Sequence, residues 1–338
     1  MLCMRLVLLC LLTVQFLAAQ APRVSMIEFY GLRHVSEARL RQALEVKEGD
    51  PLPPSKAAVE ERLEKVDGVV VARLEAVCCE ADGAILFLGI EEKGAPHFDL
   101  RPAPASSVVL PEDLVATYQA FLDRYQQTAR SGEDRESLVR GYAMAADSDV
   151  RAYQERFVEL AGQKFETVRQ VLRESVDAEH RAIAAYLIGY APDRQAAVEA
   201  LQYALQDPEP AVRHTAMRAL TAIAVFASKN PDAGLRISPT WLTEMLNSIV
   251  WGDRTQAANL LEILTQGRDA RSLDQIRERA FPSIVEMARW KSLPHALPAY
   301  VLLGRIAGLT EAQIQETWSK GERERVISEQ ASRLMRGK

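Results

Sequence analysis

The sequence predicts a small α+β domain near the N-terminus, followed by a mainly helical domain built from repeats. Three observations support this fold class. Strand-like and helix-like segments alternate up to about residue 93. Amphipathic helical segments occupy nearly all of the chain after Pro111. An internal repeat begins at Asp177 and recurs with a step that is typical of stacked helix pairs.

The first 21 residues form an apolar run with the features of a signal peptide. Arg5 precedes the run from Leu6 to Ala19, which ends in the small-residue pattern Ala19-Gln20-Ala21. The run is shorter than the roughly 20 apolar residues that a membrane-spanning helix needs. We therefore expect residues 1–21 to direct export, either as a cleaved signal peptide or as a retained short anchor.

Residues 22–94 are expected to form one small domain with the order β-α-α-β-β. Period-two alternation and β-branched residues mark the strands, and apolar residues three and four apart mark the helices. Asp82-Gly83 is a turn pair that joins the last two strands as a hairpin. In order, the expected elements are a strand over residues 24–29, helices after Ser36 and Ser55, a strand over residues 69–78 and a strand over residues 84–92.

This segment resembles a POTRA (polypeptide-transport-associated) domain over residues 24–93. The resemblance lies in Gly31 after the first strand, Gly49-Asp50 between the helices, Leu63 and Gly68 before the second strand, and Glu91 in the third strand. It implies a three-stranded mixed sheet and a role in export or envelope assembly, with partners added along the edge of the second strand. An edge strand has unpaired N–H and C=O groups that can pair with an extended peptide. The candidate contact residues there are Val71, Arg73, Glu75 and Val77.

Residues 95–111 contain four prolines and no periodicity, which indicates a linker. Residues 112–336 are expected to be helical, with the clearest repeats over residues 177–308. Aligning Arg181 with Arg213 also aligns Ala184 with Ala216, a step of 32 residues, and Arg254 follows after 41 more. The segment LQDPEPAVRHTAMRALTAIA resembles a HEAT repeat, which implies an α-solenoid with long protein-binding faces.

Arg181, Arg213 and Arg254 recur with Asp177, Asp207 and Asp253 close before them. One interpretation is a structural ladder in which aspartate–arginine pairs join successive repeats and cap helices. The other is a basic strip on the concave face that holds acidic partner segments. On the second interpretation, the candidate partner-binding residues of the solenoid are Arg181, Arg213, His214, Arg218 and Arg254.

No catalytic, cofactor-binding or metal-binding residues are predicted. The five histidines are scattered, and the chain contains no H-E-x-x-H, C-x-x-C, G-x-S-x-G or phosphate-cradling glycine motif. Carboxylate pairs such as Glu91-Glu92 and Glu60-Glu61 are explained by solvation at turns and helix surfaces. For the adjacent Cys78 and Cys79 three possibilities remain, namely structural thiols, a disulfide between the two, and metal or redox chemistry.

Composition narrows the function classes further. The net charge is -5, which does not support nucleic-acid binding, and 48% apolar residues predict a packed core. The predicted function is a non-catalytic scaffold or adaptor in the periplasm of a Gram-negative envelope, with peripheral or no membrane contact. Its expected partners are other envelope proteins or extended peptide segments, and no cofactor is expected. The alternatives are a self-associating structural envelope protein and, less favoured, an enzyme with an unrecognised site.

Overall fold

The N-terminal part of the chain folds as a three-stranded mixed sheet with two helices on one face. A computed structural model describes residues 22–80, 83–95 and 99–336, so the apolar run at residues 1–21 lies outside the described residues. The strand order is β1-β3-β2, with β1 parallel and β2 antiparallel to β3. The elements are β1 (Arg23–Tyr30), α1 (Glu37–Leu44), α2 (Lys56–Glu64), β2 (Val69–Glu80) and β3 (Gly83–Glu92). The predicted order of elements and the mixed sheet are confirmed.

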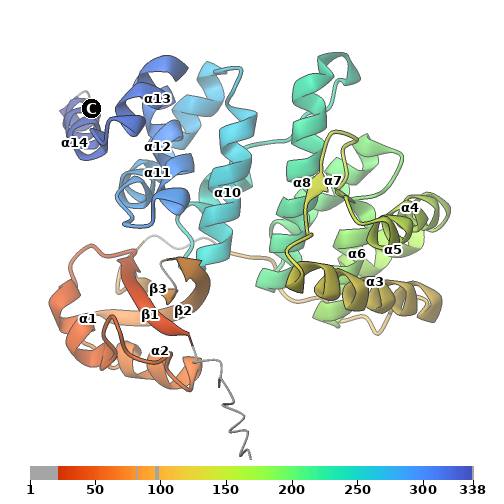
Figure 1. The fold of residues 1–338 in the computed structure, drawn as a ribbon, viewed down its shortest axis with the longest axis horizontal. Coiled ribbons are helices and arrows are strands. Elements are labelled where there is room, and N and C mark those ends of the chain that lie inside the picture. The colour runs from red at the N-terminus through yellow and green to blue at the C-terminus, as the bar shows by residue number, and fades with distance from the viewer. Residues whose placement is uncertain (1–21, 81–82, 96–98, 337–338) are drawn as a thin grey trace, which may run out of the picture.

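The rest of the described chain is a solenoid of helix pairs. Successive inner helices α4, α6, α8, α10 and α12 neighbour one another, and the remaining helices cover them from outside (Figure 1). The inner helices are α4 (Ser148–Gln163), α6 (Ala178–Ile188), α8 (Pro210–Lys229), α10 (Trp251–Leu264) and α12 (Leu293–Ile306). The others are α3 (Glu112–Arg130), α5 (Phe165–Glu174), α7 (Arg194–Ala204), α9 (Thr240–Met245), α11 (Ala270–Ala288), α13 (Glu311–Ser319) and α14 (Arg323–Arg336), with a short 3-10 helix η1 (Pro231–Ala233).

Residues 131–147, which we call the strap, interrupt the helices. They contain a minimal hairpin of β4 (Glu136–Ser137) and β5 (Met144–Ala145). The sequence predicts helix over this stretch, and that prediction is wrong. Asp147 ends the strap by accepting hydrogen bonds from the first N–H groups of α4, so the new helix starts only there.

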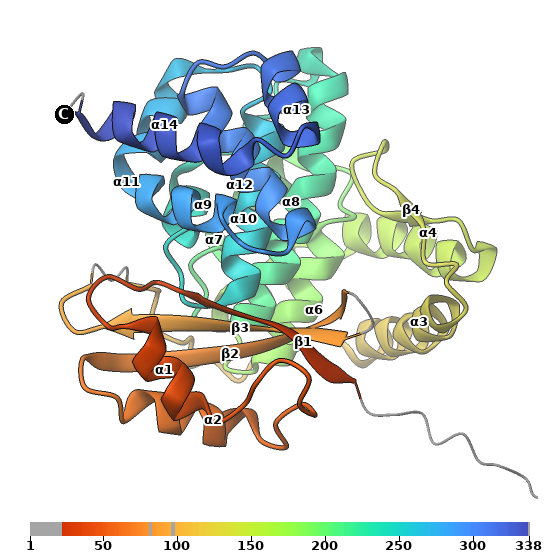
Figure 2. The same ribbon diagram turned by 60° about the vertical axis from the view of Figure 1, so that its left-hand side comes forward.

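The sheet lies between two layers of helices. One face packs on α1 and α2 through residues such as Leu86 and Leu88, and the opposite face packs on the solenoid through Ile85 and Phe87 (Figure 2). Phe87 contacts Trp251 and Trp290, with ring centroids 5.3 and 5.1 Å apart. A strand that is buried on both faces explains why the run AILFLGI does not alternate between apolar and polar residues.

Hydrogen bonds between side chains and the main chain join the sheet to the solenoid. The Tyr30 hydroxyl donates to the Ile249 carbonyl at 2.7 Å, and Lys291 N donates to Glu28 at 2.7 Å. Gly89 is required at this contact, because a Cβ there would overlap the Ile249 carbonyl oxygen. The sheet is therefore fixed against α10 and α11 and is not a freely hinged domain.

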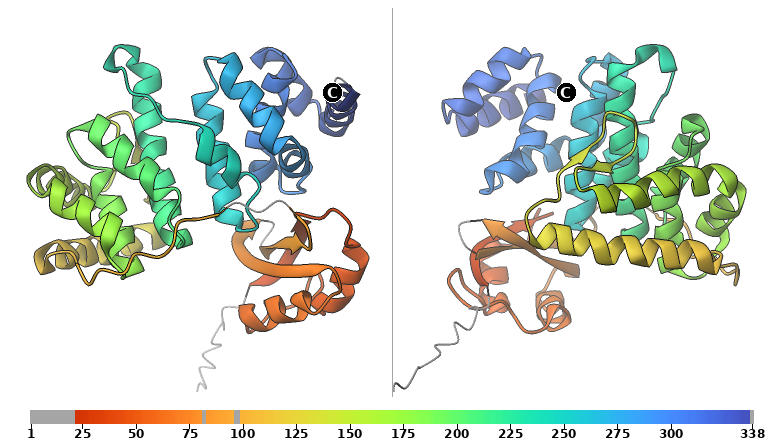
Figure 3. Two further views of the ribbon diagram at one scale, coloured as in Figure 1. Left: turned by 180° about the vertical axis from the view of Figure 1, so that it is seen from behind. Right: turned by 45° about the vertical axis from the view of Figure 1, so that its right-hand side comes forward.

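The linker follows the outer helices of the solenoid (Figure 3). Arg101 stacks over the Tyr203 ring at 3.2 Å, and Ser106 exchanges main-chain hydrogen bonds with Glu174 and Val176. Leu110 N donates to Nδ1 of His180 at 2.9 Å. These contacts order the described part of the proline-containing segment along α5, α6 and α7.

Glu92 is buried at the end of β3, which corrects the expectation that this carboxylate is merely solvated. It accepts hydrogen bonds from the N–H groups of Arg33, His34 and Val35 at 2.7, 2.8 and 3.0 Å. Burial acts to raise its pKa, but these three donors outweigh burial and hold the pKa below its usual value. Glu92 thus fixes the loop between β1 and α1.

Cys78 is disulfide-bonded, which excludes the structural thiol among the three possibilities for this residue. Its partner sulfur lies outside the described side chains. A disulfide with Cys79 therefore stays a prediction.

Candidate functional site

The repeated arginines form buried ion pairs between successive repeats. Arg181 on α6 donates to both carboxylate oxygens of Asp207, each at 2.8 Å, and Arg213 on α8 donates to both oxygens of Asp253 at 3.0 and 2.7 Å. Each arginine also donates to two carbonyl groups of the loop before its own helix. Such two-pronged pairing suits the planar guanidinium and satisfies most of its N–H groups.

The third arginine extends this ladder to the N-terminal sheet. Arg254 on α10 pairs with Glu286 on α11 at 2.7 Å, and its guanidinium lies 4.6 Å from the centre of the Tyr30 ring. The other oxygen of Glu286 accepts a hydrogen bond from Gly31 N at 2.8 Å. The ladder therefore ends on β1 instead of on a further repeat.

The ladder decides between the two interpretations of the arginines. Arg181, Arg213 and Arg254 each expose only 2% of their surface. Side chains buried to this degree cannot form a basic strip for an acidic partner, so that interpretation is wrong for these three residues. The structural ladder is what the chain forms, with Asp177 capping α6 as expected.

Asp253 is the centre of the most connected part of the ladder. Besides Arg213, it accepts a hydrogen bond from Ser248 Oγ at 2.8 Å and contacts His214 Nε2 at 3.1 Å. Burial acts to raise its pKa, but the hydrogen bonds from His214 and Arg213 outweigh burial and keep the pKa below its usual value. Because an ionised carboxylate can only accept hydrogen bonds, Nε2 of His214 is the donor in this contact.

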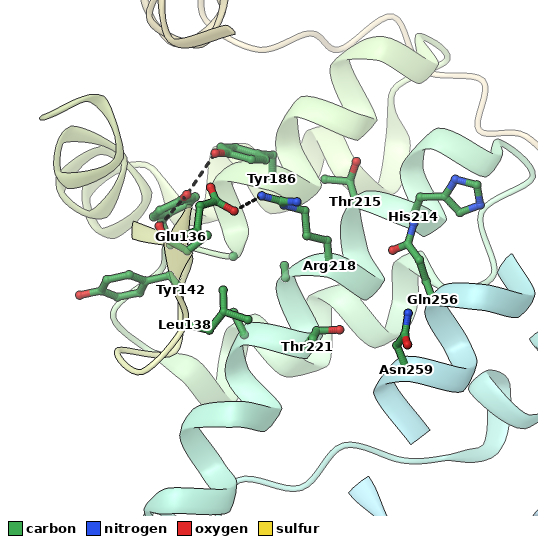
Figure 4. A pocket seen from close by; sticks show the side chains of 15 residues that line it. Glu136, Leu138, Tyr142, Tyr186, His214, Thr215, Arg218, Thr221, Gln256 and Asn259 are labelled. Atoms are coloured by element: carbon green, nitrogen blue, oxygen red, sulfur yellow. Dashed lines mark hydrogen bonds and ion pairs between the residues drawn. The ribbon is translucent and has the colours of Figure 1, made fainter. Parts of the chain in front are cut away.

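A groove of about 580 Å³ lies on the exposed side of the inner helices, beside the strap (Figure 4). Helices α6, α8 and α10 form its floor, and the strap forms one wall. Its lining residues are Glu136, Leu138, Tyr142, Ala143, Tyr186, Gly189, Tyr190, His214, Thr215, Arg218, Ala219, Thr221, Ala222, Gln256 and Asn259. This volume and a mainly apolar lining with a few polar groups are typical of ligand-binding sites.

The strap is attached to the helices by several polar contacts. Arg218 forms an ion pair with Glu136, whose other oxygen accepts a hydrogen bond from Gln154 at 3.2 Å. The Tyr190 hydroxyl donates to the Ala143 carbonyl at 3.0 Å. These contacts hold the strap wall in place beside α6 and α8.

A cluster of aromatic rings supports the groove from below. Tyr186 contacts Tyr118, Phe121, Phe157 and Tyr190, with ring centroids 5.1 to 5.7 Å apart. Burial raises the pKa of the Tyr186 hydroxyl well above its usual value, so the group is a neutral hydrogen-bonding partner at physiological pH. The cluster makes the Tyr186 end of the groove rigid and apolar.

The groove contains two of the solenoid residues predicted to bind partners, His214 and Arg218. The prediction missed Glu136, Gln256 and Asn259. A signal for one of them exists in the repeat, because Tyr186, Arg218 and Asn259 each follow a ladder arginine by five residues. Equivalent positions of successive repeats lie on the same face of a solenoid, so the aligned repeats identify the groove floor.

Helix α2 covers part of the predicted β2 edge. Glu64 accepts a hydrogen bond from Ala72 N at 3.1 Å, and Glu60 accepts one from Leu74 N at 2.8 Å. These are the outward N–H groups that an added strand would use. The edge is therefore occupied at these two positions, and Glu60 has a structural role beyond solvation.

The side chains predicted to bind at β2 lie on the sheet face that is turned toward the solenoid. The register pairs Val71, Arg73, Glu75 and Val77 with Glu91, Gly89, Phe87 and Ile85 of β3. Arg73 and Glu75 are exposed, with side-chain exposures of 47% and 50%. Val71 and Val77 are half-buried. These four residues, which we call the β2 row, are thus available to a partner through the charged side chains of Arg73 and Glu75.

Two other kinds of site are absent from the described residues. No group of three or more histidine, cysteine, aspartate or glutamate residues among them is arranged to hold a metal ion. Within the same residues, no helix has both the length and the apolar character needed to cross a membrane.

The comparisons with known proteins agree with the helical repeat. A family model for HEAT repeats matches residues 165–262. No curated protein matches the sequence.

Several solved structures are similar to part of this chain. The crystal structure of an engineered protein has 20% identity and a TM-score of 0.36, covering 56% of this chain and 91% of the other. A designed armadillo repeat protein in complex with the peptide (KR)4 has 13% identity and a TM-score of 0.35, covering 59% and 97%. The HEAT-repeat match and the elements of the structure show that the protein is mainly a helical-repeat solenoid with a small three-stranded mixed sheet, a fold that is typical of protein-binding scaffolds.

Proposed function

We propose that the protein is a non-catalytic scaffold that holds an extended segment of a partner protein in the groove. The observation that carries this proposal is the pair of amide side chains on α10. Gln256 and Asn259 line the groove and are three residues apart on α10, and their side-chain amides make no hydrogen bond with another described residue. Unused amide groups on a fixed helix can bind the main chain of an extended peptide, which offers N–H and C=O groups at regular intervals.

The β2 row is the second contact surface that we propose. Main-chain pairing is blocked at Ala72 and Leu74, so a partner would bind Arg73 and Glu75 by their side chains. Because the sheet is packed on α10, a partner can contact this row and the solenoid together. Two linked contacts strengthen binding through a high effective concentration.

The proposed location is the periplasm of a Gram-negative cell, in envelope assembly or protein transport. The apolar run at residues 1–21 supports export. The POTRA-like character of the sheet domain is supported by its element order and by three matching glycines. Gly31, Gly49 and Gly68 have φ values of 83°, 94° and 95°, a region that favours glycine, so each stands at a turn that needs this residue.

A photocrosslinking residue placed at Asn259 tests the groove in living cells. The matched control is Gln195, an exposed position on the outer helix α7. The proposal predicts a specific crosslinked protein from position 259 and none from position 195. Equal crosslinking from both positions, or none from position 259, would contradict it.

Export is tested separately from binding. Osmotic shock should release the protein with other periplasmic contents, and mass spectrometry of the released chain identifies its first residue. A chain that remains with the spheroplast and is protected there from added protease would contradict the proposed location and would leave the groove proposal standing.

A further inference from the structure

Arg218 is the one arginine or lysine among the described residues that line the groove. It lies on α8 between Tyr186 and Asn259, and 51% of its side chain is exposed. Its guanidinium has five N–H donors, and its contact with Glu136 is the only hydrogen bond that it makes with other described residues. Most of its donors therefore face the groove or the solvent.

Glu136, in contrast, has little capacity left for a ligand. Only 12% of its side chain is exposed, one oxygen is bound by Gln154 and the other by Arg218. Burial acts to lower the pKa of Arg218, but Glu136 and the nearby tyrosines outweigh burial and raise it, so the guanidinium keeps its charge. The pair thus leaves donors available for an anion and little acceptor capacity for a cation.

From this asymmetry we propose that the groove selects an extended segment that carries an acidic side chain. The carboxylate of an aspartate or glutamate in the segment accepts hydrogen bonds from the Arg218 N–H groups that do not contact Glu136. The ion pair between Arg218 and Glu136 stays intact. The amides of Gln256 and Asn259 bind the main chain of the same segment, since they line the same groove as Arg218, whose guanidinium lies on the side of the strap (Figure 4). This inference rests on the proposed function and names the chemistry of its partner.

The other wall of the groove adds an apolar preference. Leu138 and Tyr142 come from the strap and lie on the opposite side of Arg218 from Asn259 (Figure 4). A large apolar side chain near the acidic residue would pack against them and bury surface from water. The preferred segment is therefore acidic and apolar, in an extended conformation.

A phage-displayed library of random ten-residue peptides provides the probe. It is selected in parallel on the full purified chain, on Arg218→Gln and on Arg156→Gln. Arg156 is the matched control, because it is an exposed arginine on α4 that pairs with Glu159 and does not line the groove. Synthetic copies of selected peptides, with glutamate and with glutamine at the enriched position, are then measured by fluorescence polarisation.

The proposal predicts that the unmodified chain and Arg156→Gln enrich aspartate or glutamate at one position, next to an apolar residue. Arg218→Gln should lose the acidic preference and bind a selected peptide roughly ten- to a hundredfold more weakly, as expected for a hydrogen bond between charged groups. Changing the glutamate of the peptide to glutamine should weaken binding to the unmodified chain and have little effect on Arg218→Gln. Arg218→Lys should be intermediate, because it keeps the charge and loses the fork of donors.

The other outcomes separate this inference from the proposed function. Peptides enriched without an acidic position, or with lysine and arginine, would overturn the inference while the groove remained a peptide site. If no peptide is enriched, or if binding survives Asn259→Trp, which fills the groove without adding charge, both proposals fail. Circular dichroism of Arg218→Gln confirms that the comparison uses folded protein.

Discussion

Replacing Asp253 with asparagine tests whether the buried ladder joins successive repeats. The substitution keeps the size of the side chain and removes its charge. Arg213, which exposes 2% of its surface, would then be a buried cation without its counter-ion. Ser248 and His214 would also compete for the single oxygen that the amide retains.

The expected cost follows from the contacts of the carboxylate. Asp253 accepts two hydrogen bonds from Arg213 and is completely buried. Removing one partner of a buried ion pair costs about 3–5 kcal/mol, because the remaining charge stays without compensation. We therefore expect Asp253→Asn to lower the free energy of unfolding by this amount.

Urea unfolding followed by circular dichroism at 222 nm measures the loss. Glu159→Gln is the control, since its pair with Arg156 is exposed on both sides and should contribute less than about 1 kcal/mol. Adding Arg213→Met to Asp253→Asn should recover part of the loss, because no charge is then left unpaired. A loss no larger than that of the control would refute the structural role of the ladder.

Three further predictions concern the sheet. Glu92→Gln should destabilise the protein above about pH 4.3, the usual glutamate pKa, and the difference from the unmodified chain should shrink below it. The depressed pKa gives this sign, since the contribution of the carboxylate is lost as pH falls, and thermal melts across pH 3–7 measure it. Gly89→Val should separate the sheet from Ile249, so limited proteolysis should cleave between the two parts faster than in the unmodified chain. Glu60→Ala with Glu64→Ala uncovers two N–H groups of β2 and should promote association, which light scattering at several concentrations would detect; unchanged scattering would show that the edge needs no cover.

Much of the fold could be predicted because its signals are local. Capping residues, the turn pair at Asp82-Gly83 and the period of apolar residues define the order of elements in the sheet domain. The spacing of Arg181, Arg213 and Arg254 defines the repeat, and the ladder was one of its two interpretations. Local pattern and repeated spacing were sufficient for both.

The docking of the sheet on the solenoid could not be predicted in this way. Tyr30 and Ile249 are 219 residues apart, and no periodicity links them. The one signal in the sequence is the continuous apolar run of β3, which is typical of a strand that is covered on both faces. The strap was missed for a related reason, since its position depends on a contact between Glu136 and Arg218, which are 82 residues apart.

The groove depends on the same contacts that hold the repeats together. The Arg213–Asp253 pair joins α8 to α10, and these two helices supply Arg218, Gln256 and Asn259 to the groove. His214 belongs to both the ladder and the groove, since one ring nitrogen contacts Asp253 and the ring also lines the groove. The buried ladder therefore sets the spacing between the guanidinium and the amides before any partner binds. A site whose polar groups are already in position loses less conformational entropy on binding, which favours recognition of one extended segment over many.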